Sequence, residues 1–200
     1  MTLRVWVCAA LALAVLAHCS TAAHAQAPRA AEKWRRELTR QARLAFGLDA
    51  PIATLAGQIE QESGWREDAR SPVGAQGIAQ FMPGTAADLA RKLSGPAEPL
   101  NATWALRAHS TYMKELASAI RYRTECDTFG AALSSYNGGL GWHNRRRALA
   151  LDPDDFWWSV RLVNPGITAA NQRENEEYPM RVVYERQPKY STWGRGVCGN

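Results

Sequence analysis

The chain has 200 residues, of which 46% are hydrophobic and 22% are charged, and this length suits one domain with a hydrophobic core but not two. Its 24 basic and 19 acidic residues give a formal net charge of +5. That modest excess comes without the array of basic and aromatic residues that stacks nucleic-acid bases, which argues against a nucleic-acid-binding protein.

The first 25 residues have the pattern of a secretory signal peptide. Arg4 precedes an apolar run, and Ala23-His24-Ala25 offers a cleavage site of the small-x-small type. The apolar run is too short to span a bilayer comfortably, so we expect an exported, periplasmic protein cleaved near Ala25, with no transmembrane segment after cleavage. The alternative is a lipoprotein anchored through Cys19, because a leucine lies three residues before it, although the histidine directly before it fits that signal poorly.

After the leader, apolar residues recur at helical spacing along most of the chain. They predict helices over residues 30–46, 51–63, 85–93, 101–120, 129–136 and 171–185. Asn101 is a good N-cap for the fourth helix, Asn137-Gly138-Gly139 ends the fifth, and Pro179 weakens the prediction for the last one. Strand signals are nearly absent, so we expect one mainly α-helical domain over residues 26–200.

Export changes what the cysteines predict. Cys8 and Cys19 would leave with the leader, so Cys126 and Cys198 are the remaining pair. In an oxidising compartment, two cysteines without metal-ligand spacing suggest one disulfide, which would tie the C-terminal tail to the middle of the chain. The alternative is two unrelated thiols.

Neither the histidines nor the densest basic run points to a specific ligand. After the leader only His109 and His143 remain, and neither has ligand spacing, so we expect no metal and no cofactor. The run Arg145-Arg146-Arg147 could favour an anionic polymer such as a cell wall, a membrane surface or nucleic acid, or it could simply be a solvated face.

The helix predicted over residues 51–63 ends in two glutamates that could carry chemistry. Glu62 falls beside Leu55 and Ile59 on one flank of the apolar stripe, and Glu60 falls on the other flank. Burial disfavours a carboxylate and raises its pKa, and a glutamic acid tuned towards neutrality can donate a proton to a leaving group. The helical wheel alone does not choose between the two, and both could be ordinary surface glutamates.

Three blocks of residues match one known family in order. The first comprises Glu62-Ser63-Gly64-Trp65, Ala69-Arg70-Ser71, Gly74-Ala75-Gln76-Gly77-Ile78-Ala79-Gln80 and Met82-Pro83-Gly84-Thr85-Ala86. The second is Ser135-Tyr136-Asn137-Gly138-Gly139, and the third is Glu174-Asn175-Glu176-Glu177-Tyr178. Together they resemble the soluble lytic transglycosylase (SLT) domain, with a motif core over about residues 47–185. The family has alanine at 135 and threonine at 175, and usually an apolar residue where Pro179 stands, so the third block matches least well.

The resemblance implies a lysozyme-like α-helical fold with a substrate cleft and few or no strands. It also implies a lytic transglycosylase, a carbon–oxygen lyase that cleaves the β-1,4 bond between N-acetylmuramic acid and N-acetylglucosamine in peptidoglycan without water. On this pattern Glu62 acts first as acid, on the glycosidic oxygen, and then as base, on the C6 hydroxyl that closes a 1,6-anhydro ring. The expected partners are peptidoglycan glycan strands and not nucleic acid, and we expect a monomer.

The resemblance assigns supporting roles to further residues. Those expected to bind substrate are Ser63, Gln80, Met82, Tyr136, Asn137 and Tyr178. The hydroxyl of Tyr178 is also expected to orient Glu62, and Glu174 is read as structural. Gly74 and Gly77 are expected to let the backbone turn closely under a sugar ring.

Two other functions stay open at this point. A muramidase of the same fold would use water and a second carboxylate, for which Glu60, Glu67 and Asp68 lie near Glu62 in sequence. A catalytically inactive wall-binding scaffold would be expected to lack the catalytic glutamate, which is present. The sequence also leaves open whether the chain serves wall turnover or clears peptidoglycan for a secretion, conjugation or phage apparatus.

Overall fold

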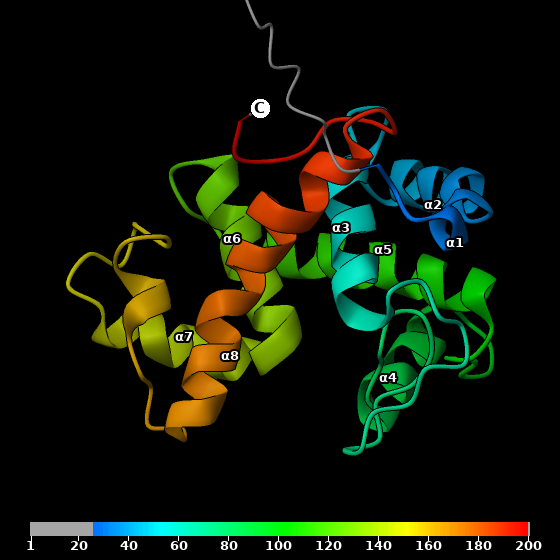
Figure 1. The fold of residues 1–200 in the computed structure, drawn as a ribbon. Coiled ribbons are helices and arrows are strands. Elements are labelled where there is room, and N and C mark those ends of the chain that lie inside the picture. Colours follow the sequence, from blue (N-terminus) through cyan, green and yellow to red (C-terminus); the bar gives the residue numbers. More distant parts are fainter. Residues whose placement is uncertain (1–25, 200) are drawn as a thin grey trace, which may run out of the picture.

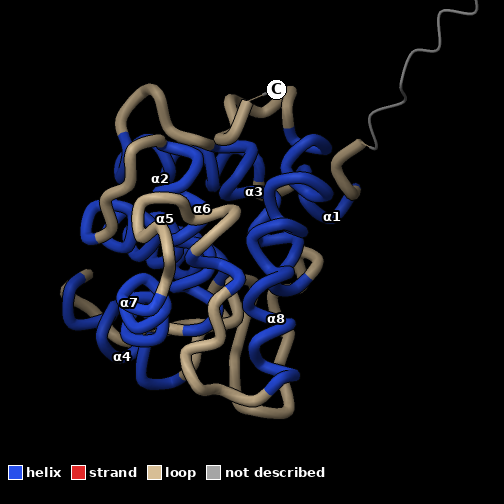
Figure 2. Tube along the Cα trace, turned by 90° about the vertical axis from the view of Figure 1, so that its left-hand side faces the viewer, coloured by secondary structure: helices blue, strands red, loops and turns tan. Residues whose placement is uncertain are grey.

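The computed structural model describes residues 26–199, and that part of the chain contains helices and loops but no strand (Figures 1 and 2). The α-helices are α1 (Arg29–Glu32), α2 (Arg35–Phe46), α3 (Ile52–Ser63), α4 (Pro83–Lys92), α5 (Ala102–Ala119), α6 (Glu125–Gly138), α7 (Leu140–Leu149) and α8 (Ala169–Met180). Shorter turns complete them: the 3-10 turns η1 (Val160–Leu162) and η3 (Gln187–Tyr190), and the π-helical turn η2 (Arg181–Arg186). The mainly α-helical prediction is confirmed.

The predicted helices are present, and capping residues account for their boundaries. Asn101 caps α5 as predicted, because its side chain accepts hydrogen bonds from the amides of Thr103 and Trp104 at 3.1 and 3.3 Å. α6 begins earlier than predicted because Thr124 caps it, accepting from the Asp127 amide at 3.0 Å. The predicted helix over residues 30–46 is wrong as a single helix, since a break at residues 33–34 separates α1 from α2.

α3 is the central helix of the domain (Figure 1). Every residue from Ile52 to Ile59 is buried, and burial of a side chain such as Leu55 contributes about 1.5–3 kcal/mol. Gly57 faces the C-terminal turns, and a Cβ at this position would lie 2.8 Å from the backbone nitrogen of Gln187. This close approach lets η2 and η3 pack along α3, which fixes the direction of its last turn.

The C-terminal helix runs through a proline. Pro179 lies in the last turn of α8, and the chain continues as the π-helical turn η2 and then as the 3-10 turn η3. A proline lacks the amide hydrogen that an α-helix needs, so its place near the end of α8 costs less than one in the middle would. The helix predicted over residues 171–185 is therefore present, with a π-helical second part.

α7 is absent from the sequence prediction. Gly139 ends α6 with a φ of +95°, and a new helix begins at the next residue. α7 turns Arg146 inward, where its guanidinium donates to Gln172 Oε1 at 2.7 Å and to Asn175 Oδ1. The interpretation of residues 145–147 as a solvated face is therefore wrong for Arg146, although Arg145 is exposed.

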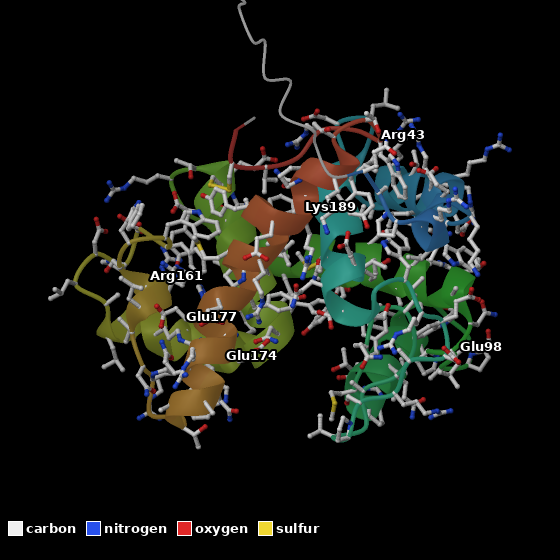
Figure 3. All side chains as sticks on the ribbon, in the orientation of Figure 1. Arg43, Glu98, Arg161, Glu174, Glu177 and Lys189 are labelled. Atoms are coloured by element: carbon white, nitrogen blue, oxygen red, sulfur yellow. A yellow bond between two sulfur atoms is a disulfide. The ribbon has the colours of Figure 1, made fainter. Side chains whose placement is uncertain are left out.

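Cys126 and Cys198 form a disulfide, which confirms the predicted pairing. The bond joins the first turn of α6 to the C-terminal tail across 72 residues of sequence (Figure 3). The tail is also held by hydrogen bonds, because the Val197 amide donates to Thr54 Oγ1 at 3.0 Å and to Gln187 Oε1 at 3.1 Å. The disulfide and these bonds together attach the end of the chain to α3.

The predicted leader, with its cleavage site near Ala25 and Cys19, lies outside the described residues. Among the helices of residues 26–199, none is long and apolar enough to cross a bilayer. Within the same residues, no three His, Cys, Asp or Glu side chains come together as a candidate metal site.

Candidate active site

The end of α3 places Glu62 beside the loop that follows. The helix stops after Ser63 because Gly64 adopts a left-handed conformation with φ +60°, and its amide donates to the Glu60 carbonyl at 2.9 Å. Trp65 also has a positive φ of +68° and is buried, with its Nε1 donating to the Tyr190 hydroxyl at 2.6 Å. The chain therefore turns away directly after Glu62.

Residues 64–82 form a compact loop beside the end of α3. Gln76 pairs in antiparallel fashion with Arg70 and with Phe81, and the Gln76 and Phe81 amides exchange hydrogen bonds of 3.0 Å. The Gly77 amide donates to the Ala69 carbonyl at 2.8 Å. These backbone bonds fix the loop, although it contains no regular strand or helix.

Gly74 and Gly77 occupy left-handed positions of this loop, with φ values of +95° and +77°. A Cβ at Gly77 would lie 1.7 Å from the Pro99 carbonyl oxygen, whereas a Cβ at Gly74 would meet nothing within 4 Å. We expect Gly77→Ala to lower the free energy of unfolding by about 3 kcal/mol or more, because a backbone cost and a steric clash add. Gly74→Ala should cost about 1–2 kcal/mol, from the backbone alone. Urea unfolding of both variants checks this, and equal losses would contradict it.

A cavity of about 420 Å³ opens where α3, this loop, α6 and α8 meet. It is lined by Gln61, Glu62, Ser71, Val73, Ala75, Gln80, Met82, Tyr136, Asn137, Glu174 and Tyr178. A second cavity of about 400 Å³ shares Val73, Asn137 and Glu174 with it and extends towards α7. The two continue one another as a cleft, and five of the six predicted substrate-binding residues line the first part.

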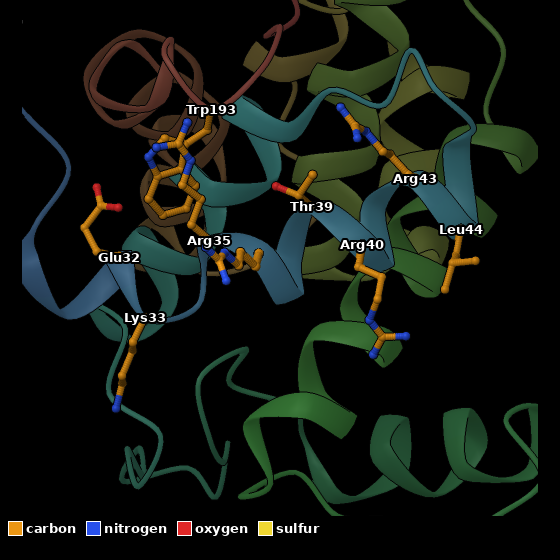
Figure 4. A pocket seen from close by; sticks show the side chains of 9 residues that line it. Glu32, Lys33, Arg35, Thr39, Arg40, Arg43, Leu44 and Trp193 are labelled. Carbon is orange, nitrogen blue, oxygen red and sulfur yellow. The ribbon is translucent and has the colours of Figure 1, made fainter.

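A larger surface hollow of about 1120 Å³ lies elsewhere, along α1 and α2 (Figure 4). Its wall consists mainly of basic side chains, including Lys33, Arg35 and Arg43, with Leu44 and Trp193 (Figure 4). Figure 3 places Arg43 near the top of the molecule and Glu174 in its lower half. The hollow contains none of the predicted site residues, so its size does not make it the candidate for catalysis.

Glu62 has the environment of a proton donor. Its side chain is partly buried, and the buried hydroxyl of Tyr178 donates a hydrogen bond to Oε1. Burial raises the pKa of Glu62 to about 8, the hydrogen bond from Tyr178 opposes this rise, and the negative charge of Glu174 adds to it. The carboxyl group is therefore mostly protonated at neutral pH.

Tyr136 connects α6 to the loop at the cavity wall. Its hydroxyl donates to the Ala79 carbonyl at 2.7 Å, and its ring packs against Tyr112 and His109 at centroid distances of 5.4 and 5.6 Å. Burial raises the pKa of Tyr136 well above its ordinary value, so the hydroxyl stays neutral. The next residue, Asn137, is exposed to the cleft, and its Oδ1 accepts from Asn175 Nδ2 at 2.9 Å.

The loop residues predicted to bind substrate differ in position. Gln80 has a left-handed φ of +49° and donates from Nε2 to the carbonyls of Gly77 and Ala69 at 2.8 and 3.1 Å. Met82 lies at the start of α4 with 44% of its surface exposed, so its thioether is open to a ligand. Ser63 is buried and absent from the cavity lining, and its hydroxyl donates to the Ile78 carbonyl at 2.8 Å. It ties α3 to the loop.

Among the acidic residues named with Glu62, none of the three nearby in sequence lines the cavity. Glu60 points to the C-terminal turns, where it pairs with Lys189 at 2.5 Å and accepts from the Tyr190 hydroxyl at 2.6 Å. Glu67 pairs with Lys33, and Asp68 is exposed on the surface of the loop. The helical wheel does not decide which of Glu60 and Glu62 is the proton donor, but their hydrogen-bond partners in the structure do.

The carboxylate that does share the cavity with Glu62 is Glu174 on α8 (Figure 3). It forms an ion pair with Arg181 at 2.8 Å, and its charge raises the pKa of Glu62. The sequence interpretation treats Glu174 as structural and does not identify it as part of the cleft. Its place in the third motif block was the available signal.

Asn175, the departure from the family's threonine, is a buried connector between helices. Its Oδ1 accepts from Ser134 Oγ at 2.8 Å, and its Nδ2 donates to the Ser134 carbonyl at 2.8 Å as well as to Asn137. Arg146 donates to the same Oδ1. Asn175 therefore holds α6, α7 and α8 together behind the cleft, which a threonine side chain could not do through the same atoms.

The chain matches a known protein family and several of its curated members. The family model of the transglycosylase SLT domain matches residues 37–156. The chain belongs to the transglycosylase SLT domain family. Membrane-bound lytic murein transglycosylase F 2 of Alkalilimnicola ehrlichii is 30% identical over 142 residues, which are 68% of this chain and 30% of that protein. Membrane-bound lytic murein transglycosylase F of Shewanella frigidimarina is 30% identical over 129 residues, which are 62% of this chain and 26% of that protein.

Solved structures of lytic transglycosylases have the same fold. An inactive mutant of lytic transglycosylase Slt from Pseudomonas aeruginosa superposes with a TM-score of 0.59 at 22% identity, covering 82% of this chain and 25% of that one. The 70 kDa soluble lytic transglycosylase of Escherichia coli gives a TM-score of 0.56 at 22% identity, covering 81% and 25%. The predicted family and fold class are confirmed, and the SLT-family chain spans less than a third of the length of these relatives.

Proposed function

We propose that this SLT-family chain is a lytic transglycosylase that acts on peptidoglycan outside the cytoplasmic membrane. It cleaves the β-1,4 bond between N-acetylmuramic acid and N-acetylglucosamine and leaves a 1,6-anhydro ring on the muramic acid. The observation that supports this proposal most strongly is the environment of Glu62. Its carboxyl group lines the cleft of an SLT domain, has a pKa of about 8 and accepts a hydrogen bond from the Tyr178 hydroxyl. The names of its relatives as murein transglycosylases support the same substrate.

In the first step Glu62 acts as a general acid. Its carboxyl proton moves to the glycosidic oxygen while the bond from that oxygen to C1 of N-acetylmuramic acid breaks. The bonding electrons leave with the oxygen, which becomes the free hydroxyl of N-acetylglucosamine, and positive charge develops at C1. The resulting Glu62 carboxylate lies beside C1 and keeps the hydrogen bond from Tyr178, which stabilises it.

In the second step the Glu62 carboxylate acts as a general base. It removes the proton from the C6 hydroxyl of the same muramic acid, and O6 bonds to C1 to close the anhydro ring. Because the nucleophile is already attached to the reacting sugar, no second molecule has to be brought into place. Glu62 ends protonated, water is neither consumed nor released, and the cycle can repeat.

The remaining cleft residues position the sugars. The two hydrogen bonds from Gln80 Nε2 hold its amide so that Oε1 is available to an acetamido N–H. Asn137 offers its amide from the end of α6, and Met82 offers an apolar surface at the start of α4. Ser63 and Tyr136 act indirectly, because their hydroxyls fix the loop through the carbonyls of Ile78 and Ala79.

The proposed acid predicts a pH dependence of the reaction rate. Glu62 is protonated below its pKa of about 8, so product formation from purified peptidoglycan should fall as the pH rises through that value. Glu174→Gln removes a charge that raises this pKa, so the same decline should move to lower pH. Rates measured from pH 3 to 10 check both expectations. A wild-type decline near the ordinary carboxyl value of 4.5 would contradict the assignment.

A muramidase is the second candidate, and Glu174 is the observation that favours it. Hydrolysis by an inverting enzyme needs a second carboxylate that activates water, and Glu174 shares the cavity with Glu62. Its ion pair with Arg181 at 2.8 Å holds the Glu174 carboxylate in place at the cavity wall. The two functions differ in their products, since water attack leaves a reducing end and attack by O6 leaves an anhydro end.

A further inference from the structure

A buried series of polar side chains lies behind Glu62, and the reaction described above uses only its first member, Tyr178. Tyr178, whose hydroxyl donates to Glu62, accepts a hydrogen bond from Gln58 Nε2 at 3.3 Å. The Oε1 atom of Gln58 lies 2.9 Å from Nε2 of His109 on α5. Gln58 and His109 are fully buried and Tyr178 is 2% exposed, so water cannot replace any of these partners.

The chemistry of the groups decides which one donates and which one accepts in each of these hydrogen bonds. The amide nitrogen of Gln58 faces Tyr178, so its oxygen faces His109 and can only accept. His109 Nε2 must then carry the hydrogen. Burial lowers the pKa of His109 to about 3, so the ring is neutral, and its Nδ1 has no partner within the described chain. Each donor thus points towards Glu62: His109 to Gln58, Gln58 to Tyr178, and Tyr178 to the carboxyl group.

We propose that Gln58 and His109 are positioning residues that hold the Tyr178 hydroxyl with its proton towards Glu62. A hydroxyl that accepts one hydrogen bond is a stronger donor for the next, and a filled acceptor site removes its freedom to turn away. This hydrogen-bond relay, from His109 through Gln58 to Tyr178, therefore stabilises the Glu62 carboxylate. The proposed mechanism forms that carboxylate in the first proton transfer. The catalytic consequence rests on the proposed function, but the effect on Glu62 itself does not.

The other charged or titratable groups around Glu62 are few and can be separated from the relay. Glu174 lies on α8 with Tyr178, Tyr136 approaches from α6, and Tyr112 stands behind Tyr136 on α5. The charge of Glu174 raises the pKa of Glu62, whereas the Tyr178 hydrogen bond lowers it. Gln58 and Glu62 lie one turn apart on α3, but the side-chain hydrogen bonds connect them only through Tyr178, so the hydrogen-bonded effect of Gln58 must disappear when the tyrosine hydroxyl is removed.

The experiment is a titration of Glu62 by NMR in the folded chain, labelled with ¹³C at the glutamate carboxyl and free of substrate. Glu62→Gln assigns the signal. We expect Gln58→Met, which keeps the length of the side chain, to raise the pKa of Glu62 so that its acid dissociation constant falls about 3- to 10-fold. Tyr178→Phe should have a larger effect in the same direction. The double variant should match Tyr178→Phe alone, because both changes remove one connected set of hydrogen bonds.

Ser110→Ala is the matched control, because Ser110 is a buried polar residue next to His109 on α5 that takes no part in the relay. It should leave the Glu62 titration unchanged. If Gln58→Met does not fold, His109→Phe decides, since it removes the donor that fixes the Gln58 amide and should shift the titration in the same direction.

Two results would overturn the proposal: an unchanged Glu62 titration in the first folded variant of Gln58 or His109, or full additivity of Gln58→Met with Tyr178→Phe. Because the titration contains no peptidoglycan, it gives its answer even for a chain without transglycosylase activity. A shifted titration with no anhydro products would refute the proposed function and leave the relay standing.

Discussion

Glu62→Gln is expected to lower the rate of anhydro-muropeptide release from purified peptidoglycan by about 10³-fold or more. General acid–base catalysis contributes typically about 10²–10⁴-fold, and here one side chain performs both proton transfers. Glutamine has nearly the size of glutamate and its amide oxygen can still accept from Tyr178, so the fold and the cleft should persist. Turnover is measured by liquid chromatography of the released muropeptides.

Glu60→Gln is the matched control for this change, because Glu60 lies on the same turn of α3 but pairs with Lys189 and Tyr190 away from the cavity. It should keep most of the activity. Comparable losses in both variants would contradict the assignment of Glu62.

The fold of Glu62→Gln should be at least as stable as the wild type at pH 8. The pKa of Glu62 is raised from 4.5 to about 8 by folding, so the native state loses stability as the pH rises between these values, by at most about 5 kcal/mol. Glutamine does not ionise, so the variant avoids that loss. A loss of activity accompanied by unfolding would therefore have another cause than the removal of the acid.

Replacement of the disulfide by Cys126→Ser with Cys198→Ser is expected to lower the free energy of unfolding by about 4 kcal/mol. The bond closes a loop of 72 residues, and in the chain-entropy model a loop of that length restricts the unfolded state by about this amount. The Val197 hydrogen bonds hold the tail natively but do not restrict the unfolded chain. Urea unfolding of the oxidised wild type and the variant measures the difference.

The reduced wild type is the control for the disulfide. Under reducing conditions it should unfold at nearly the same urea concentration as the double serine variant. A variant as stable as the oxidised wild type would contradict the account, and would show that the hydrogen bonds of the tail carry its attachment to α3.

Most of the helices follow from local rules that a sequence displays. A capping asparagine such as Asn101 and an apolar stripe at helical spacing act within a few residues of each other, and the structure agrees with both. α7 is not predicted because its residues are polar on average, so it shows no apolar stripe. It also begins directly after Gly138-Gly139, and such a glycine pair ordinarily ends a helix. It is helical because Arg146 finds buried partners on α8, and such partners exist only in the folded chain.

The site divides in the same way. The motif around Glu62 and the left-handed glycines are local, so the sequence indicates them directly. Tyr178 lies 116 residues away, and only the family resemblance implies it as the partner of Glu62. The choice of Glu62 over Glu60 depends on the C-terminal turns, because Lys189 in those turns forms an ion pair with Glu60 away from the cavity. Gln58 is a helix residue among apolar neighbours, and nothing local reveals that His109, 51 residues away, completes its hydrogen bonds.

The most direct test of Glu62 as the acid and base of a lytic transglycosylase is the mass of the products that the wild-type chain forms from purified peptidoglycan. We expect muropeptides that end in 1,6-anhydro-N-acetylmuramic acid, formed without uptake of water and absent from digests with Glu62→Gln. Products heavier by one water, with reducing ends, would contradict this expectation and would make the chain a muramidase with Glu174 as its second carboxylate.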